Sequence, residues 1–78
     1  MILKALRYVP PGRLFQDNRI FVEDAVLLSF IFELFWLEAF PAHELRAEVR
    51  SRSPEQIPES MERLIEAGYL ERVSEDQL

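Results

Sequence analysis

Three arginines stand close together in the second half of the chain, at positions 46, 50 and 52. Guanidinium groups form paired, charge-assisted hydrogen bonds with phosphate oxygens, so Arg46, Arg50 and Arg52 could hold a nucleic-acid backbone. The same side chains could instead be a solvated surface, paired with Glu44 and Glu48 at roughly helical spacing. The sequence leaves both interpretations open.

The segment that follows mixes side chains that could read bases with acids: Glu55, Gln56, Glu59, Ser60, Glu62 and Arg63. Gln56 and Arg63 have the hydrogen-bonding groups to read adenine or guanine, and Ser60 can contact either base. The three glutamates are unfavourable near phosphates. Together with Glu66 they could instead face a basic protein, or occupy a nucleic-acid site in place of phosphates. These residues therefore indicate binding, either to DNA or to a basic protein.

Side chains that catalyse reactions or bind metals are scarce. The chain has no cysteine, and its one histidine, His43, has no second type of ligand clustered around it. Glu33, a carboxylate in an apolar segment, is better explained by solvent or an arginine partner than by catalysis. The two glycines, Gly12 and Gly68, belong to turns rather than to a phosphate-binding loop. We therefore expect no enzyme, no metal and no cofactor.

The composition indicates one small globular domain. The chain has 78 residues, of which 49% are hydrophobic and 29% are charged, a balance typical of an ordered domain. Its start carries charge too early for a secretory signal. The longest apolar stretch, residues 25–40, is interrupted by polar residues and is shorter than the ~20 residues of a membrane span. We expect a cytoplasmic protein with no membrane partner.

Charge is distributed unevenly along the chain. Residues 1–22 carry four basic residues against one acid, a charge of +3, so the net charge of −5 leaves −8 for residues 23–78. A protein that binds DNA mainly through phosphates is usually basic. The charge of the larger segment therefore favours a basic partner over DNA.

Residues 1–22 are predicted to form an extended segment or a hairpin. Pro10, Pro11 and Gly12 together are a turn signal. Residues 13–16 and 19–22 flank an Asp-Asn pair that tolerates positive φ, so we expect a tight hairpin there.

Residues 24–40 are predicted to form one long helix that ends at Pro41. This helix is apolar almost all round, so every side of it must be covered. Trp36 and Phe40 fall on the same side as two polar residues. Either the N-terminal hairpin covers this side, or Trp36 and Phe40 meet another chain, for example in a homodimer.

Two shorter helices and a strand complete the prediction. The first helix covers residues 42–50. A second has a core-facing stripe formed by Ile57, Met61, Leu64 and Ile65. A capping box at residues 53–56 could start this helix earlier. Pro58 would then lie inside the helix and remove a hydrogen bond, so we expect a loose turn followed by a helix over 58–67. Residues 69–73 alternate like a strand.

The order of long helix, short helix, turn, second short helix and strand over residues 24–73 resembles winged helix-turn-helix domains. In that family the second short helix commonly ends in a leucine, a few polar residues, alanine-glycine and a strand, as residues 64–72 (LIEAGYLER) do. Residues 41–45 (PAHEL) resemble the start of the preceding helix. The resemblance implies a mainly α fold with a small β element, a three-helix domain whose missing wing strand residues 19–22 would supply.

The resemblance is compatible with two functions, because winged helices serve as DNA readers and as protein-docking modules alike. One is a small dimeric regulator of transcription that reads DNA through Gln56, Ser60 and Arg63, with the three arginines on phosphates. The alternative is an acidic inhibitor or adaptor that docks on a basic protein through its glutamates.

Overall fold

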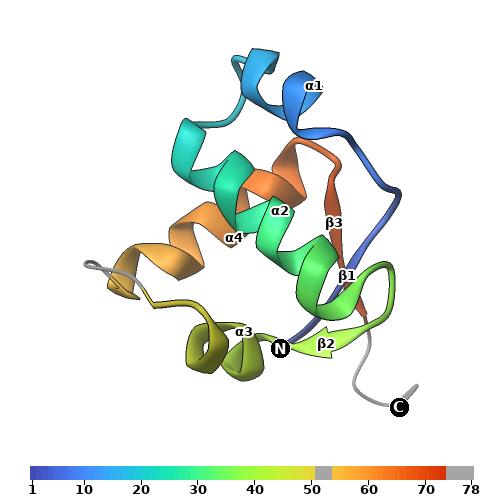
Figure 1. Cartoon of the computed structure of the whole chain (residues 1–78). Helices are drawn as coiled ribbons and strands as arrows, with labels where there is room; N and C mark the ends of the chain where they lie inside the picture. Colours follow the sequence, from blue (N-terminus) through green and yellow to red (C-terminus); the bar gives the residue numbers. More distant parts are fainter. Residues whose placement is uncertain (51–53, 74–78) are drawn as a thin grey trace.

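The computed structural model of the chain describes residues 1–50 and 54–73. The elements follow the order β1 (Ile2–Ala5), α1 (Pro11–Gln16), α2 (Val22–Phe35), β2 (Phe40–Pro41), α3 (Ala42–Glu48), the 3-10 turn η1 (Pro54–Gln56), α4 (Ile57–Glu66) and β3 (Leu70–Val73). Figure 1 shows α2 and α4 beside the sheet, with α1 at one end of the molecule and α3 at the other. The predicted class, mainly helical with a small β element, is confirmed.

β1 is the central strand of an antiparallel sheet with the order β2-β1-β3. Leu3 is opposite Phe40 in β2, and Ala5 is opposite Leu70 in β3. Leu3 and Ala5 are buried, whereas the lysine between them is exposed, as expected for a strand with one face on the core. The first residues of the chain therefore join two strands that are far apart in the sequence.

The N-terminal segment departs from the predicted hairpin. Residues 13–16 belong to α1, and residues 19–22 form no strand. Pro11 occupies the first turn of α1, where its fixed φ suits a helix and its missing N–H loses no hydrogen bond. The Pro-Pro-Gly run therefore starts a helix. The strand that pairs with β3 does come from the N-terminal segment, but it is β1 rather than residues 19–22.

α2 is shorter than the predicted helix over 24–40, because it ends at Phe35. The next residue, Trp36, has φ 57°, a conformation that is rare for a bulky side chain. The chain then turns back so that Phe40 enters β2, where its ring stacks on Phe35 with 4.4 Å between the ring centroids. Burial of the Phe40 side chain against the core explains why the helix ends before the proline.

The helices of the C-terminal half lie close to their predicted positions. α3 ends at Glu48 rather than at residue 50. α4 runs from Ile57 to Glu66 instead of 58–67, with η1 in place of the loose turn before it. Pro58 falls in the first turn of α4, where a backbone N–H has no intrahelical partner to lose.

The end of α4 is fixed by its glycine. Tyr69 N–H donates to the Leu64 carbonyl at 2.9 Å, and Gly68 N–H donates to the Ile65 carbonyl at 3.1 Å. This is a Schellman motif, and it requires the left-handed conformation that Gly68 adopts at φ 86°. The motif turns the chain directly into β3.

The core lies between the sheet and the helices, and each of the helices α1 to α4 contributes to it. Its largest fully buried side chains are Phe40, Leu3, Leu14, Leu28, Ile31, Leu45, Met61, Leu64, Leu70 and Asp24. Asp24 is the one charged residue in this set, and a buried carboxylate requires polar partners.

Candidate functional site

The outward face of α4 is acidic. Glu59, Glu62 and Glu66 recur at intervals of three or four residues and so share one side of the helix, and Glu55 lies just before it, in η1. Three of them are exposed, and Glu62 is partly exposed and paired with Arg72 of β3. We call these four glutamates the acidic face. On a recognition helix, this is the side that would approach DNA.

Another side of α4 is tied to α2 by an ion pair whose carboxylate is buried. Asp24, in the first turn of α2, accepts hydrogen bonds from Arg63 Nε at 2.7 Å and Nη2 at 2.9 Å. The guanidinium group also donates to Ser60 Oγ at 3.3 Å and lies over the ring of Phe21, 4.6 Å from its centroid. The backbone N–H of Phe21 completes the set by donating to Asp24 at 2.9 Å. These contacts fix the start of α2 against α4.

The charges of this pair compensate each other. Burial by itself would raise the pKa of Asp24, because a buried carboxylate loses its hydration. The hydrogen bonds from Arg63, the Phe21 N–H and Ser60 outweigh burial and hold the pKa of Asp24 below its ordinary value. The hydrogen bonds to Asp24 raise the pKa of Arg63. Both groups are therefore ionised at neutral pH, and Arg63 adds no net charge to the surface.

The side chains predicted to read bases are not presented together. Ser60 is 6% exposed, and the Arg63 guanidinium is held by Asp24. Neither belongs to the outward face of α4, which corrects the expectation for both residues. Gln56 is exposed, but it lines a groove beside α2.

Two of the arginines predicted to hold phosphates lie on the surface. Arg46 and Arg50 are exposed, on α3 and just after it. Within residues 1–50 and 54–73 neither of them forms an ion pair, so the alternative of local pairing with Glu44 and Glu48 is not observed. Arg52 lies outside the described residues.

An apolar groove of about 280 Å³ lies between α2, the end of α3 and the start of α4. Its apolar lining includes Val22, Val26 and Phe30 of α2, together with Val49 and Ile57. The three α2 side chains are 60%, 40% and 47% exposed in that order. Their spacing of four residues places them in a row along the helix. The groove is therefore an apolar surface that the protein leaves open.

Acids border this groove on the side of the α2–α4 contact. Glu23 belongs to the lining. The negative charges of Glu23 and Glu59 both raise the pKa of Arg63, so both acids lie near that guanidinium group. Arg50 supplies a positive charge among the described lining residues. Glu59 is not itself a lining residue, but it directly precedes Ser60, which is, so the acidic face adjoins the groove there.

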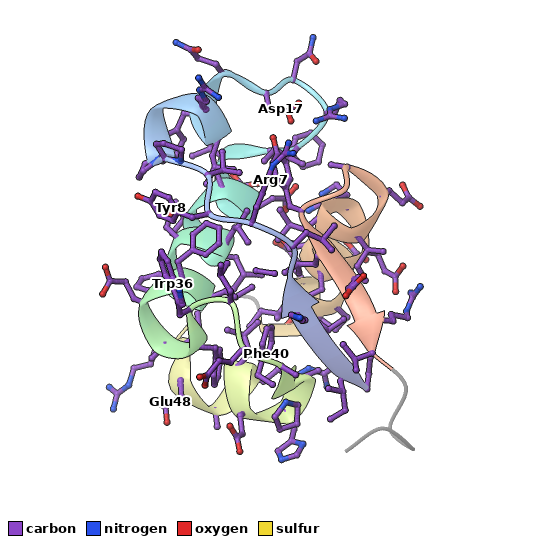
Figure 2. The ribbon with its side chains drawn as sticks, turned by 90° about the vertical axis from the view of Figure 1, so that its right-hand side faces the viewer. Arg7, Tyr8, Asp17, Trp36, Phe40 and Glu48 are labelled. Atoms are coloured by element: carbon purple, nitrogen blue, oxygen red, sulfur yellow. The ribbon has the colours of Figure 1, made fainter. Side chains whose placement is uncertain are left out.

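Trp36 and Phe40, predicted to share an interface, are separated by the fold. Phe40 is 1% exposed, so it is a core residue and not an interface residue. Trp36 is 52% exposed and stacks on Tyr8 with 5.4 Å between the ring centroids. Tyr8 also contacts Phe32, at 5.0 Å between centroids. Figure 2 shows Tyr8 and Trp36 along one side of the molecule. The segment after β1 thus covers part of α2.

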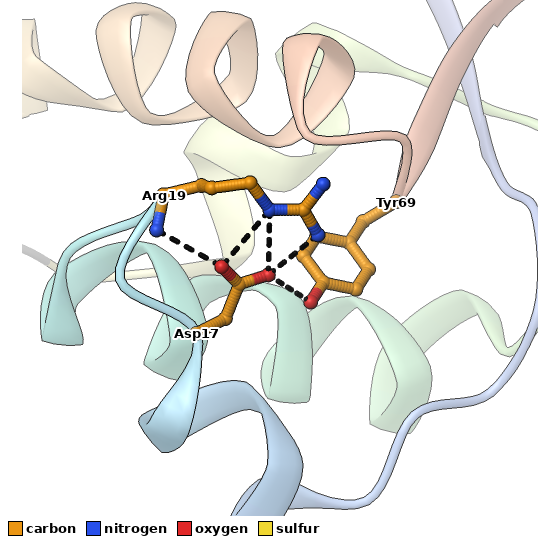
Figure 3. Close-up of polar contacts among 3 residues, drawn as sticks. All are labelled: Asp17, Arg19 and Tyr69. Carbon is orange, nitrogen blue, oxygen red and sulfur yellow. Dashed lines mark hydrogen bonds and ion pairs between the residues drawn. The ribbon is translucent and has the colours of Figure 1, made fainter.

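A second polar cluster joins the loop after α1 to the residue before β3 (Figure 3). Asp17 accepts hydrogen bonds from Arg19 N at 2.9 Å, from Arg19 Nη2 at 2.8 Å and from the Tyr69 hydroxyl. The bonds from Arg19 and Tyr69 hold the pKa of Asp17 well below its usual range. The bond to Asp17 raises the pKa of Tyr69. This cluster fixes the loop that leads into α2.

Other kinds of site find little support in the part of the chain that the structure describes. Those residues include no group of three or more His, Cys, Asp or Glu that could hold a metal ion. His43 is exposed in the first turn of α3. No helix among the described residues has both the length and the apolar character needed to cross a bilayer.

Comparison with protein-family models, curated proteins and solved structures gave no match.

Sequence reasoning missed the groove and both polar clusters. The groove had a signal, the four-residue spacing of Val22, Val26 and Phe30. In a helix that is apolar almost all round, however, this spacing does not reveal which side stays open. Asp24 and Arg63 are 39 residues apart, so no local pattern connects them.

Proposed function

We propose that this protein is a non-enzymatic docking module that binds a basic amphipathic helix of another protein. The observation that carries the proposal is the open groove, with α2 side chains 40% to 60% exposed, next to the acidic face of α4. Soluble monomers rarely expose large contiguous apolar patches, and apolar patches with polar rims mark interaction sites.

The row of apolar side chains on α2 suits a helical partner. A partner helix with apolar residues at i and i+4 would pack along Val22, Val26 and Phe30. The groove of about 280 Å³ has room for side chains that anchor such a helix. The body of the partner helix would then lie across the mouth of the groove, next to the acidic face.

Charge favours a basic partner. Residues 23–78 carry −8, since the whole chain carries −5 and residues 1–22 carry +3. Asp24 neutralises Arg63, so the positive charge that remains in the described lining of the groove is Arg50. Complementary potentials of this kind speed association and reject partners of the wrong charge. The same acids oppose a phosphate backbone, which supports a protein partner over DNA.

The proposal is tested by titrating the protein into a fluorescently labelled helical peptide that repeats leucine at i and i+4 among lysines and alanines. We expect a saturable rise in anisotropy that weakens with added salt. Phe30→Ser removes an apolar contact in the groove, and Glu59→Lys reverses a charge at its border. Each should weaken binding about tenfold, the effect of ~1.4 kcal/mol.

Matched variants away from the groove serve as controls. Phe15, on α1, is 51% exposed, so Phe15→Ser changes a comparable surface phenylalanine. Glu38 is an exposed acid after the far end of α2, so Glu38→Lys makes the same charge change as Glu59→Lys. Both control variants should keep the affinity of the parent protein. Failure of the lysine peptide to bind, or equal binding of a peptide with glutamate in place of lysine, would contradict the proposal.

Two further outcomes would replace the proposed partner with another. A mixed-sequence labelled duplex that binds, and that Arg46→Glu with Arg50→Glu releases, would favour the DNA-binding regulator. A dimer in sedimentation that Phe30→Ser dissociates would place a second copy of this chain in the groove.

A further inference from the structure

A second hollow, of about 450 Å³, lies between the segment after β1, the helix α1 and the residue before β3. It is lined by Arg7, Tyr8, Val9, Pro10, Arg13 and Tyr69. None of these residues belongs to the lining of the groove. Two arginines and two tyrosines give this hollow a hydrogen-bonding and positively charged wall, in contrast to the apolar wall of the groove.

The positive charge of the hollow is not cancelled by its surroundings. Arg7 and Arg13 are exposed, and across residues 1–50 and 54–73 neither forms an ion pair. Asp17 lies next to the hollow, because it accepts a hydrogen bond from the hydroxyl of the lining residue Tyr69. The guanidinium group of Arg19 already neutralises the negative charge of Asp17, to which it donates hydrogen bonds. A ligand entering the hollow would therefore meet two unpaired guanidinium groups.

We propose that this hollow binds the dianion of a phosphate monoester. Guanidinium groups match phosphate oxygens with paired hydrogen bonds, and two arginines balance the two negative charges that such a group carries. The ring of Tyr8, which is 47% exposed, supplies apolar surface for the organic part of the ester. The site goes beyond the proposed function and does not depend on it.

The test follows the midpoint of thermal unfolding, Tm, as sodium phosphate is added, against sodium chloride at the same ionic strength. A ligand that binds only the folded state raises Tm in a saturable way. We expect such a rise for phosphate, and at least about tenfold weaker binding in Arg7→Gln with Arg13→Gln, because each lost guanidinium removes charge-assisted hydrogen bonds. Arg46→Gln, which changes an exposed arginine on α3, should leave phosphate binding unchanged.

Adenosine monophosphate and phosphoserine, titrated in parallel, identify the source of the phosphate. Equal affinities for both esters and for inorganic phosphate would mean that the phosphate group itself is recognised. Tighter binding of one ester would assign the site to a nucleotide or to a phosphorylated side chain. The proposal fails if phosphate raises Tm no more than chloride does, or if the double variant binds phosphate like the parent protein.

Discussion

At the scale of single residues, Asp24 and Arg63 determine which charges reach the surface. Asp24 is fully buried, and a buried carboxylate without a partner is strongly destabilising. Arg63 supplies that partner, and its guanidinium group is thereby engaged by Asp24. The same pair therefore links the stability of the α2–α4 contact to the acidic character of the proposed binding surface.

Replacing Arg63 should show the size of this effect. Arg63→Met leaves the Asp24 charge buried and unpaired, so we expect the free energy of unfolding to fall by about 3 kcal/mol. Urea denaturation followed by the fluorescence of Trp36, the single tryptophan, measures it. Asp24→Asn combined with Arg63→Met should be less destabilising than the sum of the single changes. Additive effects would show that the two residues do not interact.

The pH dependence of stability provides a second test. The pKa of Asp24 in the folded protein lies below its ordinary value, so the ionised form stabilises the fold. This contribution is complete above the unfolded pKa of about 4 and is lost as the pH falls through the lower, folded pKa. The stability difference between the parent protein and Asp24→Asn should therefore be constant near neutral pH and narrow below about pH 4. A difference that persists unchanged in acid would contradict this assignment.

At the scale of elements, β1 holds the sheet together as its central strand. Leu3 is 0% exposed, so Leu3→Ala should lower the free energy of unfolding by about 2–5 kcal/mol through the lost contacts and the cavity left behind. Lys4 is exposed on the same strand. Lys4→Ala should therefore change the free energy of unfolding by no more than about 0.5 kcal/mol. Urea denaturation of the two variants compares them. Similar effects at both positions would mean that β1 does not pack on the core.

The elements that the sequence predicted best are those with local signals. The apolar periodicity of residues 57–65 and Gly68 placed α4 and β3 within a residue or so of their observed positions. The end of α2 and the identity of β1 could not be predicted, because both depend on Phe40 meeting Leu3 across the sheet. The resemblance to winged helix-turn-helix domains stays a prediction, since a small sheet with helices is not diagnostic of that family.

The candidate site was predictable only in its acidic part. The spacing of Glu55, Glu59, Glu62 and Glu66 indicates a shared helix face without any structure. The orientation of Ser60 and Arg63 could not be derived in the same way, because it depends on a buried partner in α2. The base-reading role of these residues stays a prediction, although Ser60 is buried and the Arg63 guanidinium is held by Asp24.

At the scale of the whole molecule, charge and apolar surface divide the protein into two distinct regions. Residues 1–22 carry +3 and supply every described lining residue of the hollow except Tyr69, whereas residues 23–78 carry −8 and supply every described lining residue of the groove except Val22, together with the acidic face. Each region has its own proposed ligand of opposite charge. The basic helix would bind at the groove, and the phosphate group would bind in the hollow.

In the proposed function, the groove and the acidic face form one docking surface. Titration of ¹⁵N-labelled protein with the leucine–lysine peptide, followed by amide chemical shifts, tests this claim directly. We predict that shifts concentrate at Val26, Phe30 and Glu59, while the amide of Phe15 on α1 stays unchanged. Shifts that avoid the groove, or that arise only when a DNA duplex is added and centre on Arg46 and Arg50, would contradict the account.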